Sequence, residues 1–399
     1  MTSFQDLDLF NPTPEHQMLR KTVRDFVDKE VEPQALEHDR AERFNLPLFR
    51  KLGPLGLLGI TVAEEHGGSG MDAVAACIVH EELSASDPAF CLSYLAHSML
   101  FVNNFYVNAN EEQRKRHLHK VCSGESIAGM CMSEPGYGTD VLGMQTKAVK
   151  KGDHYLITGR KMWITNGCTD DKSLGDLFLV YAKTQTGGGE KVSSFLVEKG
   201  FEGFKLGQKI RDKAGMRASS TAELVFDECV VPEKNRLGQE GESMIHMMRN
   251  LEIERVTLAA MSVGIARRCL EVMTRYALER KSFGKPIAEY GQIQRYIADS
   301  YAQYMAAKSY VYDVARKMRL DRHGNRMDSD GVKLVATTMA KQVADNAIQV
   351  LGGYGYVGEY VVERLWRDAK LLEIGGGTLE AHQKNITRDL AKNLDLLRR

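Results

Sequence analysis

The sequence changes character twice along its 399 residues, and this limits the folds that it can adopt. The first part carries apolar side chains at helical spacing after the Thr13-Pro14 pair, in which threonine can cap a helix and proline can take its first position. Near Ile127 the pattern changes to short β-rich runs, and after Gly241 long helical patterns return. We therefore predict an α+β multidomain chain with an N-terminal helical domain at 1–126, a central β domain at 127–240 and a C-terminal helical bundle at 241–399.

The central segment favours an antiparallel β-sandwich or β-barrel over alternating strands and helices. The turn Lys151-Gly-Asp separates two strand-like runs, as in a hairpin. Further runs rich in β-branched and aromatic residues begin at Lys161, Leu177, Ser194 and Ala222. The last segment shows helical patterns whose apolar stripes predict a four-helix bundle. These patterns lie near 242–280, 289–319, 330–351 and 378–398.

The composition excludes several classes of protein. Lys and Arg number 53, as do Asp and Glu, so the formal charge is zero and no nucleic-acid partner is expected. No apolar run approaches the about 20 residues that a membrane span needs. The N-terminus reads neither as a secretory signal nor as an Arg-rich transit peptide. The seven cysteines are scattered and His97, His119 and His382 lack metal-ligand spacing, so we expect a reducing compartment and no metal site.

Two stretches of the β domain could contact a cofactor. In 130-MCMSEPGYGTDV-141 a glycine-containing turn could present backbone N–H groups beside the hydroxyls of Ser133 and Thr139. An ordinary surface turn explains the same composition. In 161-KMWITNG-167, Trp163 could pack against a flat ring while Thr165 bonds its edge, although a core tryptophan is the commoner case. No Gly-rich phosphate motif follows a strand, which disfavours a nicotinamide site of the Rossmann type.

The segment 251-LEIERVTLAA-260 supplies a candidate base. Glu252 and Glu254 are two residues apart on a predicted helix, so they point to different faces, and one must lie closer to the bundle interior. A carboxylate in apolar surroundings has a raised pKa, which suits a general base near neutral pH. Two solvated surface acids are the alternative on burial statistics. Further along the chain, the stretch 371-LLEIGGGTLEAHQ-383 has three consecutive glycines at 375–377, so these positions carry no side chain just before another predicted helix.

The order of these motifs resembles the acyl-CoA dehydrogenase family over nearly the whole chain. The motifs are MSEPGYGTD, WITNG, RDKAGMRASSTAELVFDECVVP, RKSFGKPI, QVLGGYGY and WRDAKLLEIGGGT, in that order. Within the family, SYLAHSML, EKGFEGF and LEIER are most similar to the isovaleryl-CoA dehydrogenase branch. The resemblance implies N-terminal helices, a central β domain and a C-terminal four-helix bundle.

The resemblance also implies a function. It implies FAD, a homotetramer built as a dimer of dimers, and electron transfer to an electron-transfer flavoprotein. The reaction would be α,β-dehydrogenation of a short branched acyl-CoA, with isovaleryl-CoA converted to 3-methylcrotonyl-CoA in leucine catabolism. The compartment would be the mitochondrial matrix in a eukaryote and the cytoplasm in a bacterium. A straight short-chain or 2-methyl-branched substrate, a flavin oxidase or monooxygenase, and a flavin-binding scaffold without catalysis are the alternatives.

The catalytic residues follow from a departure from the family pattern. Most members carry a glutamate two residues before the threonine of the final motif, where this chain has Gly376. In the isovaleryl branch the base comes from the bundle helix before an arginine, which is Glu254 here, with Glu252 as the fallback. The N–H of Gly376 would bind the thioester carbonyl, and the glycines would leave room for a branched chain. The predicted substrate-binding residues are Thr139, Glu252, Arg255, Gly375, Gly376 and Gly377.

The resemblance also assigns the FAD-binding residues to positions of this sequence. Those near the flavin are Met130, Met132, Ser133, Gly138, Thr139, Trp163, Ile164 and Thr165. Those expected to reach an FAD across a subunit interface are Arg280, Phe283, Gln349, Gly352 and Gly353. Thr378 and Glu380, at the start of the last predicted helix, are expected to meet the cofactor. One position departs from the family, because Gly291 stands where a glutamine is usual and Gln292 follows it.

Overall fold

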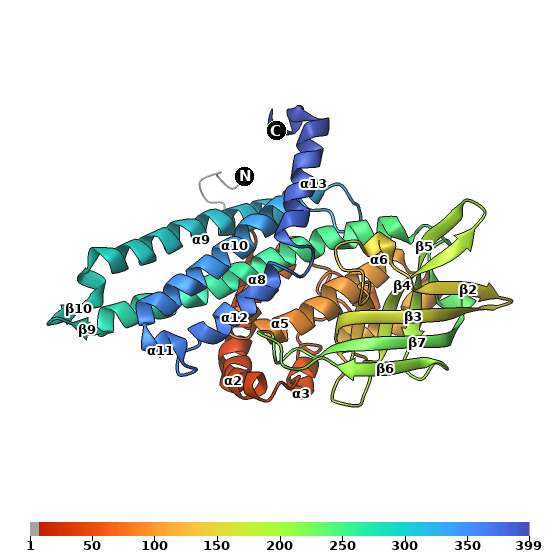
Figure 1. The fold of residues 1–399 in the computed structure, drawn as a ribbon, viewed down its shortest axis with the longest axis horizontal. Coiled ribbons are helices and arrows are strands. Elements are labelled where there is room, and N and C mark those ends of the chain that lie inside the picture. Colours follow the sequence, from red (N-terminus) through yellow and green to blue (C-terminus); the bar gives the residue numbers. More distant parts are fainter. Residues whose placement is uncertain (1–7, 399) are drawn as a thin grey trace.

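The computed structural model describes residues 8–398 and shows an elongated molecule with helices at one end and a β domain at the other (Figure 1). The N-terminal helices lie between these two ends. They are α1 (Pro14–Phe26), α2 (Glu32–Arg40), α3 (Leu46–Arg50), α4 (Ala73–Ser84), α5 (Pro88–Leu95), α6 (Asn104–Asn108) and α7 (Glu111–Ser123), with π-helical turns at Val27–Val31 and Ala96–Asn103. One-turn 3-10 helices lie at Glu64–His66, Val141–Gly143, Glu233–Asn235, Ile287–Glu289 and Leu394–Arg398.

Side-chain caps set where several of these helices begin. The Thr13 hydroxyl accepts a hydrogen bond from the His16 N–H, as expected for the start of α1, with Pro14 in the first turn. Asp72 and Asp87 cap α4 and α5 in the same way. All of α4 is buried, because its sequence is apolar around most of its circumference and it lies between α1 and α8.

The β domain contains one large curved sheet. Its strands are β1 (Ala128–Cys131), β2 (Lys147–Lys151), β3 (His154–Thr165), β4 (Leu177–Thr186), β5 (Gly189–Glu198), β6 (Phe204–Lys209), β7 (Thr221–Pro232) and β8 (Arg236–Leu237). The strand order is β6-β7-β3-β2-β4-β5-β8, and β1 also pairs with β4. The predicted hairpin at residues 151–153 joins β2 to β3.

Two ladders of this sheet differ from the antiparallel arrangement that the sequence predicts. The β1–β4 and β2–β4 pairs are parallel, and the other pairs of the large sheet are antiparallel. A parallel pair needs a long crossover connection, and residues 132–176 supply one between β1 and β4. The sheet is therefore mixed.

Strand β4 (Leu177–Thr186) joins the β domain to the helices because both of its faces are buried. Leu177, Leu179 and Tyr181 pack in a cluster with residues of α6 and α7. The alternating residues Phe178 and Val180 face the interior of the β domain. This period-two burial explains why the strand is apolar at every position from 177 to 182.

The C-terminal part is built on three long helices. Its elements are α8 (Ser243–Glu279), α9 (Gly291–Lys317), α10 (Arg326–Leu351), α11 (Gly353–Tyr356), α12 (Val362–Leu372) and α13 (Leu379–Lys392), and the short strands β9 (Lys281–Ser282) and β10 (Lys285–Pro286) form the turn between α8 and α9. Helices α8, α9 and α10 pack on one another, and α12 packs on α8 and α10. The sequence analysis missed α12 and placed the last helix in the bundle. Helix α13 instead contacts α10 near its base and then projects from the molecule (Figure 1).

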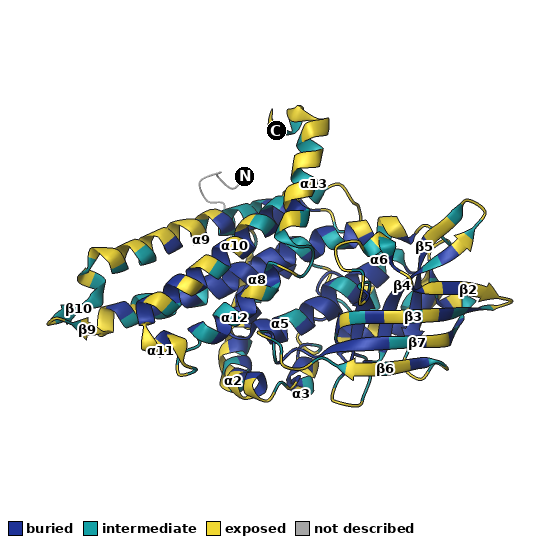
Figure 2. Cartoon of the chain, in the orientation of Figure 1, coloured by how far each residue is buried: buried dark blue, intermediate teal, exposed yellow. Residues whose placement is uncertain are grey.

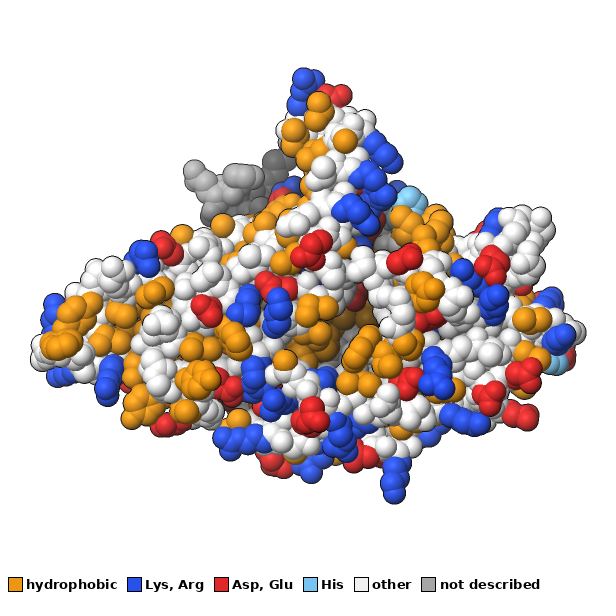
Figure 3. Space-filling view, in the orientation of Figure 1, with side chains coloured by type: hydrophobic (Ala, Val, Ile, Leu, Met, Phe, Trp, Pro, Cys, Tyr) orange, Lys and Arg blue, Asp and Glu red, His pale blue; other side chains and the backbone are white. Residues whose placement is uncertain are grey.

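Burial follows this packing. The middle of α8 is dark in Figure 2, whereas most of α9 and α13 faces outward. Acidic and basic side chains are intermixed over the face in Figure 3, in line with the balanced composition. Within residues 8–398, no helix combines the length and apolar character needed to cross a membrane.

Candidate active site

Glu254 lies in the middle of α8 and is buried. Its Oε2 atom has no hydrogen-bond partner among residues 8–398. Burial raises the pKa of this carboxyl group to about 7, and the positive charges of Arg255 and Lys333 limit the rise. A buried carboxylate with a free oxygen and a pKa near neutrality has the properties of a general base.

The glycine loop, residues 375–377, lies beside Glu254. A Cβ atom at Gly376 would be 3.5 Å from Glu254 Cδ and Oε1. The structure therefore brings together the two departures from the family pattern, one on α8 and one after α12. No acceptor within residues 8–398 binds the Gly376 N–H, which is left free for a ligand.

Glycine is favoured at position 376 for two physical reasons. Its φ is +69°, a region that side chains disfavour, and a Cβ would lie 2.4 Å from Leu258 Cδ1. Leu258 thus takes the space that a side chain at 376 would fill. The glycine leaves less additional room for a branched acyl chain than the sequence analysis suggested.

Glu252 has a structural role, and the structure does not bring it to the glycine loop. Its carboxylate accepts hydrogen bonds from the N–H groups of Gly324 (3.1 Å) and Asn325 (2.8 Å), just before α10. Because it is two residues from Glu254 on the same helix, it points to another face of α8. The fallback base, also predicted to bind substrate, instead satisfies the backbone at the start of α10.

A buried polar cluster lies beneath the glycine loop. The Asp330 carboxylate forms an ion pair with Arg255 (Nη1 to Oδ1, 3.0 Å) and accepts a hydrogen bond from Asn385 Nδ2 (3.1 Å), and its Oδ1 lies 2.6 Å from His382 Nδ1. His382 is buried, and burial lowers its pKa. The Nζ atom of Lys333 donates to the carbonyl oxygen of Gly377 at 2.6 Å. This cluster joins α8, α10 and α13 at the site.

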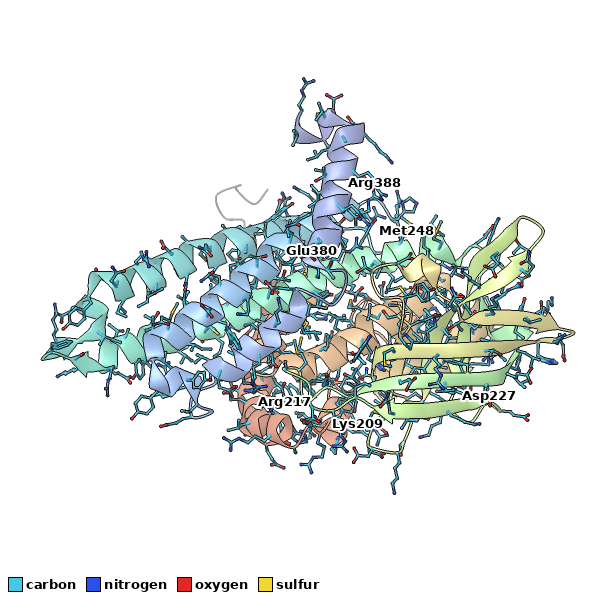
Figure 4. All side chains as sticks on the ribbon, viewed as in Figure 1. Lys209, Arg217, Asp227, Met248, Glu380 and Arg388 are labelled. Carbon is cyan, nitrogen blue, oxygen red and sulfur yellow. The ribbon has the colours of Figure 1, made fainter. Side chains whose placement is uncertain are left out.

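Thr378 and Glu380 lie where α13 begins. The Thr378 hydroxyl accepts a hydrogen bond from the Ala381 N–H at 3.3 Å and caps the helix, as expected. Glu380 is exposed in the first turn, at the base of the projecting helix (Figure 4). The helix N-terminus favours a polar or anionic group nearby.

The segment expected to line the flavin begins at β1, close to α8. The sulfur of Met130 lies 3.8 Å from the side-chain amide nitrogens of Asn104 and Asn250, and Asn250 is one helical turn before Glu254. The backbone oxygen of Ser133 accepts a hydrogen bond from the Met162 N–H at 2.9 Å, which joins this segment to β3. The two predicted flavin-contacting stretches therefore lie side by side.

Trp163 is exposed, so the alternative of a core tryptophan is wrong. A register shift between Lys161 and Ile164 interrupts the β3–β7 ladder, and Trp163 has a φ of +64° there. Its side chain is 61% exposed while Ile164 is buried. An indole held outward by a bulge offers a surface for a flat ring.

The turn after β1 also has room for a cofactor. A Cβ atom at Gly136 or Gly138 would meet nothing within 4 Å. Met132, Ser133, Thr139 and Thr165 are partly or fully exposed around it. Lys161, which the sequence analysis missed, is buried and anchors the turn through the Met132 carbonyl (3.0 Å) and the Glu134 carboxylate (2.9 Å). The outward indole, the open glycine turn and the free Glu254 oxygen fit a flavin that lies between the β domain and α8.

The other predicted FAD contacts lie at the far end of the bundle. Arg280 follows α8, and a rise of about 1.5 Å per residue places it roughly 39 Å from Glu254. Phe283 is 97% exposed in the adjoining turn, and Gln349, Gly352 and Gly353 lie at the C-terminal end of α10, also exposed. The single chain does not bring these residues to its own site. Their contact with an FAD bound to another subunit stays a prediction.

Most of the described chain matches the domains of one enzyme family. The N-terminal domain of acyl-CoA dehydrogenases matches residues 13–125, the middle domain residues 129–229 and the C-terminal domain residues 244–391. The chain belongs to the acyl-CoA dehydrogenase family. This confirms the resemblance and the fold inferred from the motifs.

Relatives and solved structures in this family differ in substrate. The chain is 42% identical to mitochondrial isovaleryl-CoA dehydrogenase of Solanum tuberosum, over 96% of this chain and 92% of the relative. It is similar to the structure of butyryl-CoA dehydrogenase from Megasphaera elsdenii, with a TM-score of 0.90, 33% identity, and 98% and 100% of the two chains covered. It is also similar to a glutaryl-CoA dehydrogenase from Mycobacterium smegmatis in complex with FADH2, with a TM-score of 0.89, 27% identity and coverage of 96% and 95%. The protein is therefore an FAD-dependent acyl-CoA dehydrogenase.

Besides Lys161, the sequence analysis missed Leu258, Asp330 and Lys333. Leu258 lies next to the LEIER motif on α8, whereas Asp330 and Lys333 lie on α10 without a motif around them. A charged residue on the buried face of a helical pattern was the available signal for Lys333, because Val332, Ala336 and Ala340 around it are apolar. Seven free cysteines are buried, and no group of His, Cys, Asp or Glu within residues 8–398 could hold a metal.

Proposed function

We propose that the protein converts isovaleryl-CoA to 3-methylcrotonyl-CoA, with Glu254 as the base. The observation that carries this proposal is the position of the buried Glu254 carboxylate beside Gly376, where the usual carboxylate of the family is replaced. The identity to an isovaleryl-CoA dehydrogenase supports the branched substrate. The narrow space between Gly376 and Leu258 is the feature that would select the shape of the acyl chain.

The residues of this chain can be assigned separate tasks. Glu254 would take the α-proton on its free Oε2 atom, and the pKa of about 7 suits this transfer near neutral pH. The free Gly376 N–H would donate to the thioester carbonyl as negative charge develops there, and such a donor contributes about 2.7–4 kcal/mol to the transition state. Trp163 would pack on the flavin ring. Bound FAD supplies the two-electron acceptor for this oxidation.

The assembly and the electron acceptor form part of the same proposal. Phe283, almost completely exposed at the end of the bundle, would be covered by another subunit in a homotetramer. An electron-transfer flavoprotein would reoxidise the enzyme, as family membership suggests. Sedimentation of the purified protein and reoxidation with that acceptor test these two points separately.

The base is tested by replacing Glu254 with glutamine. We expect Glu254→Gln to bind FAD but to reduce it with isovaleryl-CoA about 10²–10⁴-fold more slowly, because general-base catalysis contributes a factor of this size. The measurement is anaerobic stopped-flow absorbance of the flavin. Glu271→Gln, on the same helix and exposed, is the matched control and should behave as the unmodified protein. Full turnover by Glu254→Gln would refute the assignment.

The substrate is tested in the same instrument. We expect isovaleryl-CoA to reduce the flavin faster than butyryl-CoA or a 2-methyl-branched acyl-CoA. One methylene in an apolar pocket changes the rate by about 10–200-fold, so the ranking should be clear. If butyryl-CoA were the fastest, the dehydrogenase assignment would stand and the isovaleryl assignment would fall.

A further inference from the structure

Lys333 is a buried lysine without a carboxylate partner. It lies on α10 (Arg326–Leu351) and is inaccessible to solvent. Within residues 8–398, no Asp or Glu oxygen lies within ion-pair distance of its Nζ atom, and its closest polar contact is the Gly377 carbonyl at 2.6 Å. Burying an ammonium group without a counter-ion is costly, so the position calls for a specific role.

The contact with Gly377 holds one end of the glycine loop in place. Gly376 and Gly377 both have positive φ values, +69° and +103°, so this stretch has little intrinsic preference for one conformation. On one side, the Gly375 N–H closes α12 by donating to Leu371 O at 2.8 Å. On the other side, Lys333 holds the Gly377 carbonyl. These two anchors leave the Gly376 N–H between them, pointing at no acceptor of the described chain.

The charges around Glu254 single out the same lysine. Two cations face the base, Arg255 from α8 and Lys333 from α10. Arg255 is neutralised by Asp330 at 3.0 Å, so Lys333 carries the positive charge that no acid pairs. The other charged or titratable groups that face Lys333 are Asp330 on α10, Glu373 after α12 and His382 on α13.

We propose that Lys333 is a positioning residue for this reaction, which ties the glycine loop to α10 through the Gly377 carbonyl and places a buried positive charge beside Glu254. Burial lowers the pKa of Lys333 to about 8, with Glu254 opposing this effect. Both groups are therefore charged between about pH 7 and pH 8, where the base must be ionised. The inference rests on the proposed role of Glu254.

The test compares four single variants in flavin reduction by isovaleryl-CoA across pH 5.5–9, values chosen to bracket about 7. Lys333→Met removes the charge and the anchor, Lys333→Gln removes the charge but keeps an N–H donor, and Lys333→Arg keeps both. Lys341→Met, on the same helix and partly exposed, is the control. A lost neighbouring cation should move the midpoint of the pH–rate curve upward by about one pH unit.

We expect this upward shift in Lys333→Met and Lys333→Gln, a return to the original midpoint in Lys333→Arg, and no change in Lys341→Met. Well below the midpoint, a shift of about one unit makes the rate of the two neutral variants about tenfold lower. A uniform loss of rate with an unchanged midpoint in the neutral variants would overturn the proposal, because it would indicate a merely structural lysine. If Lys333→Met failed to bind FAD, the Lys333→Gln and Lys333→Arg pair would still give this comparison.

Hydrogen exchange separates this proposal from the assignment of the base. We expect the Gly375 amide, which donates to Leu371 O at one end of the glycine loop, to exchange at least several-fold faster in Lys333→Met than in Lys341→Met, without any acyl-CoA present. Equal exchange in these two variants would refute the anchoring role. Full turnover by Glu254→Gln would refute the base assignment while leaving the exchange result intact, so the two failures are distinguishable.

Discussion

Two sites with buried carboxylates lie in the helical core, and they differ in how many cations surround them. Glu81 and Glu82 on α4 (Ala73–Ser84) are surrounded by cations: Arg20 bonds them at 3.1 and 2.7 Å, Arg267 bonds Glu82 at 2.7 Å, and Lys308 bonds Glu81 at 2.9 Å. Glu254 on α8 has a free oxygen and no ion pair within residues 8–398.

The pKa values follow from these surroundings. Burial alone would raise the pKa of Glu81, but Arg20, Lys308 and Arg267 outweigh burial and lower it to about 2. For Glu254 burial prevails, and the pKa rises to about 7. Glu81 and Glu254 are therefore both buried, and they differ in the number of cations around them. This number decides whether a buried acid stabilises the fold as an ion pair or can exchange a proton near neutral pH.

The largest expected effect concerns stability. Glu81→Gln should lower the free energy of unfolding by about 3–5 kcal/mol, because it leaves Lys308 without its carboxylate and leaves Arg20 with Glu82 alone. Glu254→Gln should leave stability unchanged or raise it, since it removes a buried acid that lacks a partner. Urea unfolding of the two variants measures the difference. Equal destabilisation would show that compensation does not distinguish the two sites.

The pH dependence of stability should differ in direction between the two acids. The folded-state pKa of Glu81 is below its ordinary value of 4.5, so its stabilisation is present above pH 4.5 and is lost as the pH falls towards 2. The folded-state pKa of Glu254 is above 4.5, so its contribution is fully present below pH 4.5 and is lost as the pH rises through 7. In thermal unfolding across this range, Glu81→Gln should reduce the fall in melting temperature between pH 4.5 and pH 2, and Glu254→Gln should reduce the fall between pH 4.5 and pH 7. If each variant instead changed the pH range assigned to the other, the comparison would be contradicted.

A smaller effect is expected when the glycine beside Glu254 is replaced. Gly376→Ala should cost about 1–3 kcal/mol of stability, because alanine is strained at a positive φ and its Cβ meets Leu258. Gly375→Ala is the matched control, since its added Cβ would come no closer than 3.6 Å to Leu371 O and its φ is not positive. Comparable melting temperatures for the two variants would show that Leu258 yields without cost. Slower flavin reduction in Gly376→Ala than in Gly375→Ala would sharpen the assignment of the Gly376 N–H.

The smallest expected effect lies at the start of α13. Thr378→Ala removes the hydroxyl that caps this helix and should cost about 0.5–2 kcal/mol, whereas Thr378→Ser should retain the cap. Circular dichroism during urea unfolding gives the measurement. Because α13 packs mainly on α10, a loss well above this range would mean that the cap supports the site and not only the helix.

Much of the fold could be predicted because its signals are local. Helical and strand periodicity separated the three parts of the chain, and the Thr13-Pro14 start and the β2–β3 hairpin lie where their residues indicated. The prediction was less accurate for features that depend on contacts between segments far apart in the sequence. The parallel pairing of β1 with β4 depends on a crossover connection, and α12, not α13, packs against both α8 and α10. A periodic pattern shows that one face of a helix is apolar, but it does not identify the partner of that face.

The sequence by itself determined the family and the order of the three parts, and it predicted that an acid at 254 takes the place of a missing carboxylate at 376. Only the tertiary structure decided which of the two neighbouring acids faces the glycine loop, that Trp163 is turned outward by a bulge, and that Lys333 reaches Gly377. The physical reason is that burial and electrostatic compensation are sums over groups from several distant segments. A residue's own neighbours in the sequence carry little information about that sum.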